Sequence, residues 1–398
     1  MNHRNHIKPR YELFEYEPCL LPRVDLPEKV GHDLWQKFDE QSKVLQVRFP
    51  SPITEQKWSL TSQGWVGVLA TKDIELLLSP RFSIKNIFGL WAYVYGFEKS
   101  PLKDGWTQLE TVADFPHLLA GWLAKSVIRC AKTGFAKSYI NQTETLPYVR
   151  GRVLQFQPTK TAVFCQYDQL TTNIPDNQIL AYTLNLLCRS PLLDMKVQQQ
   201  VRQATHLINQ VAEAVPFTTE EINGRIYHPH TEKYRLMHQL CRFFLEQIGP
   251  AHAFGEAPFS TFLIHTPTLF ERFVAKWLKQ NLPPQWRINI QERISLDTDN
   301  PLVFQIDIVL YNKQEGTPLA VVDTKYKTGA KISSSDIHQI IAYAKVKSSP
   351  NAILIFPTDE KVSLNVHVDD IHLQALHFDL NQSFEQAGQQ IISQIFNL

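Results

Sequence analysis

Two apolar segments in the last third of the chain constrain its fold most strongly. The segments FQIDIVLY (304–311) and LAVVDTKYK (319–327) are typical of buried strands. The polar connection between them, residues 312–317, suits a hairpin turn. Side chains alternate along a strand, so Asp323 and Lys325 project from one face. Pairing the two strands would bring Asp307 beside them.

Two carboxylates and a lysine among apolar strand residues cost free energy unless they are paired or bound to a metal ion. Clustered oxygen donors suit Mg²⁺, a hard cation that keeps several of its waters. A lysine nearby can orient or deprotonate a water, or stabilise the charge that develops on a phosphate. The spacing therefore suits metal-assisted hydrolysis of a phosphodiester. The alternative is an Asp–Lys salt bridge on a solvated strand face.

A third acidic residue, Glu271, has two competing interpretations. It lies at the edge of the apolar stripe of TLFERFVAKWL (268–278), within a helix that we expect from Thr266 to about Gln280. From that edge it could reach a site beside the core. However, Thr268-x-x-Glu271 also fits a capping box, in which the glutamate would only complete the helix start. The spacing alone does not choose between them.

A polar pair lies on the helix that we expect over residues 336–345. Gln339 and Tyr343 are four residues apart and so share one helix face. They could contact a ligand backbone or hold the neighbouring strands in place. Ordinary polarity at a helix–sheet interface is the alternative.

The length and the element pattern predict three parts, since 398 residues exceed one typical core. Residues 1–170 form a mixed α/β region with strands at 65–70 and 74–78 and helices at 86–95 and 115–132. Residues 171–255 form a helical connecting region with helices at 176–188, 192–215 and 234–248. Residues 256–398 form a compact α/β domain, whose further strands lie at 288–292, 303–311, 319–326 and 352–356.

The charge balance argues against a polybasic coat for nucleic acid, because 40 Lys and Arg oppose 39 Asp and Glu. A local patch is still present. Between residues 121 and 163, Glu144 is the only acid, and the bases are Lys125, Arg129, Lys132, Lys137, Arg150, Arg152 and Lys160. Such an excess can neutralise DNA phosphates. It also suits an acidic protein partner or a solvated helix face.

Several classes are disfavoured by what the sequence does not contain. No stretch approaches the apolar length of a membrane span, and the first residues carry no apolar signal region, so we expect a cytoplasmic protein without a membrane partner. The five widely spaced cysteines include no CxxC pair, which disfavours a zinc ribbon. No GxxxxGK[ST] motif occurs, so we expect no nucleotide bound by this chain.

Taken in order, the candidate residues resemble the motifs of the PD-(D/E)xK nuclease superfamily. These residues are Glu271, Asp307, Asp323-Thr324-Lys325 and Gln339-x-x-x-Tyr343. Ile306 stands where the superfamily name implies proline. Three other stretches, residues 74–97, the block ending in Arg150-Gly151-Arg152, and residues 164–184, resemble the McrC family, the nuclease subunit of McrBC-type (5-methylcytosine-specific) restriction systems. The resemblance covers roughly residues 65–356.

The resemblance implies a DNA endonuclease that uses Mg²⁺, with Mn²⁺ as a substitute. Asp307, Asp323, the Thr324 carbonyl and Glu271 would hold the metal, and Lys325 would position the attacking water. Gln339 and Tyr343 would hold the DNA backbone. The implied partners are double-stranded DNA and an McrB-type AAA+ GTPase hexamer that uses GTP, into which the N-terminal part docks. A non-cleaving activator of that ring and a stand-alone repair nuclease are the alternatives.

Overall fold

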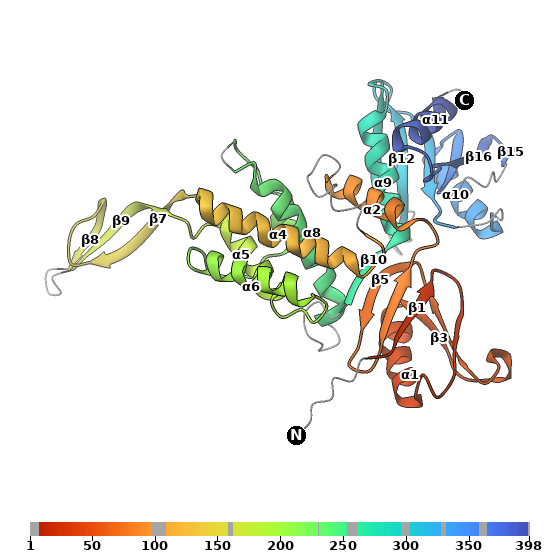
Figure 1. Cartoon of the computed structure of the whole chain (residues 1–398). Coiled ribbons are helices and arrows are strands. Elements are labelled where there is room, and N and C mark those ends of the chain that lie inside the picture. The colour runs from red at the N-terminus through yellow and green to blue at the C-terminus, as the bar shows by residue number, and fades with distance from the viewer. Residues whose placement is uncertain are drawn as a thin grey trace.

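The computed structural model describes residues 8–97, 109–157, 162–229, 231–252, 261–295, 303–327, 332–357 and 364–396. The chain folds into several sheets and helices that form an elongated molecule (Figure 1). This confirms the predicted multidomain α/β class. The division at residues 170 and 255 stays a prediction. None of the helices in the described ranges is both long and apolar enough to cross a membrane.

Two small sheets make up the N-terminal region. The first has the order β1 (Arg10–Phe14), β6 (Glu75–Ser79), β5 (Trp65–Ala70) and β10 (Thr261–His265). The second has the order β2 (Cys19–Leu21), β4 (Trp58–Ser62) and β3 (Leu45–Arg48). The remaining elements are α1 (Glu28–Leu34), the π-helix η1 (Trp35–Gln41) and the 3-10 turn η2 (Pro52–Thr54). Strand β10 comes from far along the chain, and it leads directly into the C-terminal domain.

A helical region follows, and its helices share one apolar core. They are α2 (Ile84–Tyr95), α4 (Asp114–Thr133), α5 (Pro175–Leu187), α6 (Met195–Asn209), α7 (Thr219–Asn223) and α8 (Tyr234–His252). Helix α4 packs on α5, α6 and α8. The helix predicted over 192–215 is shorter at both ends. It begins after Asp194, whose carboxylate caps the Val197 amide at 2.7 Å.

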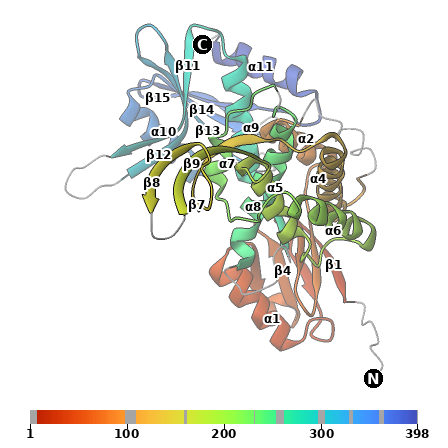
Figure 2. The same ribbon diagram turned by 90° about the vertical axis from the view of Figure 1, so that its left-hand side faces the viewer.

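A three-stranded antiparallel sheet extends from this helical region. We call it the arm, and it consists of β7 (Ser138–Leu146), β9 (Ala162–Thr171) and β8 (Arg152–Gln157), in that order. The arm projects to one side of the molecule, away from the C-terminal domain (Figure 1). Figure 2 turns the molecule so that the arm faces the viewer. These strands were not predicted from the sequence.

The C-terminal domain is a six-stranded sheet with helices on both faces. Its strand order is β11 (Trp286–Ser295), β12 (Val303–Asn312), β13 (Pro318–Thr324), β14 (Asn351–Phe356), β16 (Ile371–His377) and β15 (Asn365–Val368). Helices α9 (Thr266–Asn281) and α11 (Phe384–Phe396) share a core with one face. Helix α10 (Ser334–Lys347) packs on the other face. The predicted β12–β13 hairpin is confirmed, since the two strands pair antiparallel.

Candidate active site

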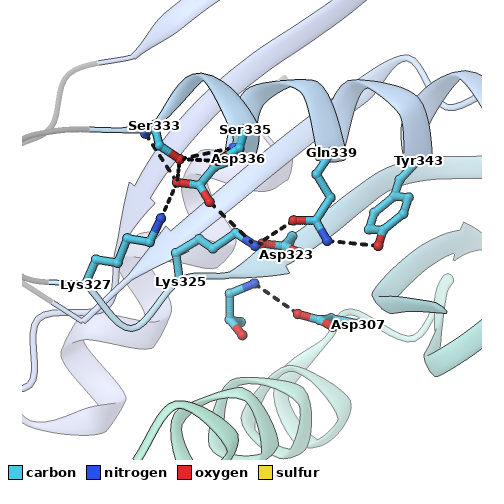
Figure 3. Close-up of polar contacts among 10 residues, drawn as sticks. Asp307, Asp323, Lys325, Lys327, Ser333, Ser335, Asp336, Gln339 and Tyr343 are labelled. Carbon is cyan, nitrogen blue, oxygen red and sulfur yellow. Dashed lines mark hydrogen bonds and ion pairs between the residues drawn. The ribbon is translucent and has the colours of Figure 1, made fainter. Parts of the chain in front are cut away.

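The hairpin β12–β13 brings Asp307 to the end of strand β13, as the alternation predicted. Ile308 pairs with Val322, so Asp307, the residue before Ile308 in β12, lies beside the polar end of β13. There the Asp307 Oδ2 accepts a hydrogen bond from the Thr324 amide at 3.4 Å (Figure 3). Asp307 is half-buried. Its position depends on strand pairing and not on any local motif.

Asp323 is the most buried of the candidate acids, with 3% of its surface exposed. Its Oδ2 lies 2.8 Å from the Lys325 Nζ, so Asp323 and Lys325 do lie on the same side of the end of strand β13. That oxygen is fully buried and receives no hydrogen bond of good geometry, although it makes this ion pair. A buried carboxylate oxygen that has an ion pair but no well-aligned hydrogen bond is costly, which makes Asp323 the least satisfied acid of the site.

Helix α10 holds the lysine from the other side. Lys325 Nζ donates to Gln339 Oε1 at 2.9 Å, and Gln339 Nε2 donates to the Tyr343 hydroxyl at 2.9 Å (Figure 3). The Asp336 Oδ1 lies 3.9 Å from the same ammonium. The four-residue spacing therefore brings Gln339 and Tyr343 together, as predicted. Gln339 connects this pair to Lys325. Contact of this pair with DNA stays a prediction.

Glu271 does not form a capping box, so that alternative is wrong. Helix α9 begins at Thr266 with His265 as its N-cap, because strand β10 runs up to His265. Thr268 therefore lies inside the first turn, and its hydroxyl contacts the His265 ring at 2.8 Å. The Glu271 carboxylate instead accepts a hydrogen bond from Gln291 on β11.

The electrostatics of the three acids show that they are close together. Burial, helped by the negative charge of Glu271, raises the pKa of Asp307 to about 6. Burial also raises the pKa of Asp323 to about 6, and the charge of Asp307 adds to this. The pKa of Glu271 is raised by burial as well. Lys325 interacts with each of the three acids, and their combined charge exceeds its own.

The donor set suits a divalent cation bound through few protein ligands. In the described ranges, no group of three or more His, Cys, Asp or Glu side chains could hold a metal ion as a cage. Mg²⁺ does not require one, because it keeps several waters and is usually bound through one or two carboxylates and substrate phosphates. The unsatisfied oxygen of Asp323 and the raised pKa of both aspartates fit such a cation. The main-chain carbonyl of Thr324, the residue after Asp323, offers a further oxygen donor.

Two residues of this environment were missed in the sequence. Asp336 lies near Lys325, and its signal was the pattern Ser333-x-x-Asp336, which forms the capping box of α10. Gln291 faces Glu271 from a position with positive φ (54°) in β11. No sequence pattern marks such an irregular strand position.

The basic residues lie elsewhere. Lys125, Arg129, Lys132, Lys137, Arg150 and Arg152 are all exposed, on α4, on the segment after it and at the arm. Figures 1 and 2 together place α4 and the arm away from the strands that carry the carboxylates. The Arg150 guanidinium stacks over the Tyr167 ring at 3.9 Å from its centroid. Lys160 lies outside the described residues.

Comparisons with known proteins agree with this architecture. The chain is 19% identical over 344 residues to the Type IV methyl-directed restriction enzyme EcoKMcrBC of Escherichia coli K12, which covers 79% of this chain and 97% of that protein. It superposes with a TM-score of 0.60 and 14% identity on a chain of the half-complex from the tetradecameric assembly of Thermococcus gammatolerans McrB AAA+ hexamers with bound McrC. That match covers 96% of this chain and 100% of the other, and at this identity it concerns the fold alone.

A cryo-EM structure of the Thermococcus gammatolerans McrBC complex also matches, with a TM-score of 0.46 and 14% identity over 69% of this chain and 88% of that one. The family model described as McrBC 5-methylcytosine restriction system component covers residues 60–357. Because this match spans well over half of the 398 residues, the chain belongs to the McrBC 5-methylcytosine restriction system component family.

Proposed function

We propose that this chain is the metal-dependent endonuclease subunit of a McrBC-type restriction system and works with an AAA+ GTPase ring. The observation that carries the proposal is the half-buried Asp307 and the buried Asp323 beside Lys325, where one oxygen of Asp323 has the lysine ion pair but no well-aligned hydrogen bond within the described residues. Membership of the family and a fold similar to a McrB–McrC assembly support the partner. GTP would be used by that partner.

The proposed roles follow from the donors that each residue offers. Asp307, Asp323 and the Thr324 carbonyl would hold Mg²⁺, or Mn²⁺ in its place, with Glu271 bound directly or through water. When bound, the cation would polarise the scissile phosphate as a Lewis acid. Burial of the two aspartates excludes bulk water from their side of the site, which strengthens their interaction with a cation.

Lys325 would act on the water and on the phosphate. Its ammonium has acceptors besides Asp323, since the Gln339 side-chain oxygen binds it at 2.9 Å. It can therefore keep its position when Asp323 is engaged elsewhere, and its charge then faces the phosphate oxygens. The hydrogen bond from Gln339 to Tyr343 fixes the orientation of the amide that performs this task.

Replacement of the lysine tests the assignment, and the chain offers a matched control. Lys325→Met should lower Mg²⁺-dependent DNA cleavage by about 100-fold or more, because preorganised charge at a reacting group contributes on that order. Lys327→Met should cleave within a few-fold of wild type, since Lys327 pairs with Asp336 at 2.6 Å and is 44% exposed. Both variants should still bind and stimulate the GTPase. Wild-type cleavage by Lys325→Met would refute the site.

The same assays separate the alternatives. A non-cleaving activator would stimulate GTP hydrolysis, but neither the wild-type chain nor its variants would cleave DNA. A stand-alone nuclease would cut DNA equally well with and without the GTPase. We expect cleavage that needs the partner and that Lys325→Met removes without changing GTP turnover.

We further propose that the arm contacts a protein partner. It exposes several large apolar side chains, namely Tyr139, Tyr148, Val149, Val153, Leu154 and Leu170. Exposed apolar groups gathered on one small sheet favour a protein surface over DNA phosphates. Arg150 and Arg152 lie beside them and would pair with acidic groups of that partner, whereas Lys125, Arg129, Lys132 and Lys137 are placed for either DNA or the partner.

A cross-strand pair provides the test. Tyr139 and Leu170 face each other in the β7–β9 register and are 69% and 50% exposed. Replacing both by Ser should weaken partner binding at least 10-fold, as expected for apolar interface residues, and leave thermal unfolding nearly unchanged. Unaltered partner affinity would exclude the arm as the contact.

A further inference from the structure

A buried carboxylate of the N-terminal segment, that of Glu15, contacts the chain segments that carry the candidate site. Glu15 follows β1 and is 0% exposed. Its main chain is held on two sides, because the Glu15 amide donates to the Ser79 carbonyl at 3.1 Å and the Tyr16 amide donates to the Ser62 carbonyl at 3.0 Å. The side chain is therefore fixed at the edge of the N-terminal sheets. Nothing in the proposed nuclease chemistry uses it directly.

The Glu15 carboxylate contacts both chain segments that carry the site. One oxygen, Oε1, contacts the hydroxyl of Thr266, the first residue of α9, which also carries Glu271. The other oxygen, Oε2, accepts hydrogen bonds from the Tyr326 hydroxyl at 3.2 Å and from the Arg81 amide at 3.2 Å. Tyr326 directly follows Lys325. One side chain thus connects the start of α9 to the end of β13.

Counting protons indicates which form of Glu15 completes this network. The Thr266 hydroxyl contacts both Glu15 Oε1 and the Gly64 carbonyl oxygen, the latter at 3.0 Å. A carbonyl only accepts, and a hydroxyl has one proton to give. Both contacts are hydrogen bonds only when Glu15 carries a proton on Oε1 and donates it to Thr266. Burial raises the pKa of Glu15, which agrees with the neutral acid.

The surroundings of Tyr326 make it a rigid connection. Its ring packs edge-on against Phe82, at 5.7 Å between centroids, and at a tilt against Phe270, at 6.1 Å. Phe270 neighbours Glu271 in α9, and Phe82 follows the Arg81 amide that also binds Glu15. Tyr326 itself is 6% exposed. A shift of Glu15 would therefore be passed to the strand end that presents Lys325.

We propose that Glu15 is a positioning residue, a neutral hydrogen-bonding centre through which the N-terminal sheets fix the start of α9 and the Lys325–Tyr326 turn. Its effect on DNA cutting rests on the proposed nuclease function, whereas its effect on the order of these two segments does not. The N-terminal segment, through Glu15, thereby takes part in setting the geometry of the candidate site in the C-terminal domain.

Three variants of the full-length chain test this proposal. Glu15→Gln keeps the shape and can still donate to Thr266, whereas Glu15→Leu keeps the size and loses every polar contact. Glu12→Leu is the matched control, because Glu12 is an exposed carboxylate in β1, three residues before Glu15, that binds Ser79 at 2.5 Å and, among the described residues, none of the C-terminal domain. Each is compared by amide hydrogen exchange without metal and by cleavage kinetics in the complete assembly with its GTPase.

The expected results differ between the variants. Glu15→Leu should accelerate exchange of the Thr266 and Lys325 amides, which bond Gly64 and Ile355, by about 10-fold or more, as expected when buried polar groups lose their partner. Its kcat should fall by a similar factor with KM for DNA nearly unchanged. Glu15→Gln and Glu12→Leu should match wild type in both measurements.

Each remaining outcome overturns part or all of the proposal. Exchange and kcat of Glu15→Leu equal to wild type would refute the positioning role. Equal damage by Glu15→Gln would refute the neutral acid. If Glu15→Leu fails to fold, Tyr326→Phe decides, since loss of its hydroxyl alone should accelerate exchange at residues 323–327. If no protein cuts DNA, wild type included, the nuclease proposal fails while the exchange data still judge Glu15.

Discussion

In metal-free buffer at pH 8, the Asp323→Asn variant should unfold at a higher temperature than the wild-type chain. When Mg²⁺ is present, the same variant should lose DNA cleavage. The reason for the higher unfolding temperature is that the folded protein must hold the Asp323 charge in a site where burial raises its pKa from the usual 3.8 to about 6. Asparagine has nearly the same shape and can still accept a hydrogen bond from Lys325. It removes the cost of ionising a buried group.

The magnitude follows from the two pKa values. An acid whose pKa is raised on folding stabilises the native state fully below the unfolded pKa, and this stability is lost as the pH rises through the folded pKa. Between about pH 4 and pH 6 each unit removes roughly 1.4 kcal/mol, so roughly 3 kcal/mol is missing at pH 8. Asp323 is 3% exposed, so solvent screens little of this. For a chain of 398 residues this gain should raise Tm by about 4 °C.

Thermal unfolding in EDTA at pH 5 and pH 8 is the assay. The advantage of Asp323→Asn should be largest at pH 8 and shrink toward pH 5. Mg²⁺ at 1,000 times its Kd should reverse the order, because it adds about 4.1 kcal/mol to the protein that binds it. An Asn variant that melts at or below the wild-type temperature in EDTA at pH 8 would refute the reasoning, as would an advantage that does not depend on pH.

Two further predictions concern stability away from the site. His238 is 0% exposed and bonds a tyrosine hydroxyl and a main-chain carbonyl, and burial lowers its pKa to about 4. The unfolding free energy of the wild-type chain should therefore fall by about 1.4 kcal/mol per pH unit from pH 6.5 toward 4. Urea titrations of His238→Gln should show a shallower fall with pH, and equal slopes for variant and wild type would contradict this. Gly388→Ala should destabilise by about 1–3 kcal/mol, since its Cβ would lie 2.1 Å from the Trp277 ring, whereas Gly224→Ala, with 3.8 Å of clearance, should not.

The pairs within the site could be predicted from local periodicity. Asp323 and Lys325 lie two apart on a strand end, and Gln339 and Tyr343 lie four apart on a helix, so each pair has only one arrangement in its element. Glu271 could not be decided in this way. The helix start depends on where β10 ends, and β10 is fixed by its pairing with β5 about two hundred residues earlier.

The arm escaped prediction for a different reason. Strand β7 exposes most of its side chains, and only Leu146 at its end is buried. Pattern analysis detects a strand by its buried apolar face, and in the arm such a face is short, consisting of Leu146 and of Val163, Cys165 and Tyr167 of β9. Glu15 was hidden for the opposite reason, since its partners Thr266 and Tyr326 are buried but lie 251 and 311 residues away. No local pattern encodes such contacts.

Burial alone does not separate the structural carboxylates of this chain from the candidate catalytic ones, whereas the supply of hydrogen-bond donors does. Glu15 is buried and has a raised pKa, yet both of its oxygens have hydrogen-bond partners. Burial also acts on Glu292, but hydrogen bonds from a lysine, a tyrosine and an asparagine hold its pKa below the usual value. Asp323 is nearly as buried as Glu15, and its Oδ2 has the Lys325 ion pair but no well-aligned hydrogen bond within the described residues. A fold that satisfies its other buried acids leaves this one incomplete, which is why we expect a cation to complete it.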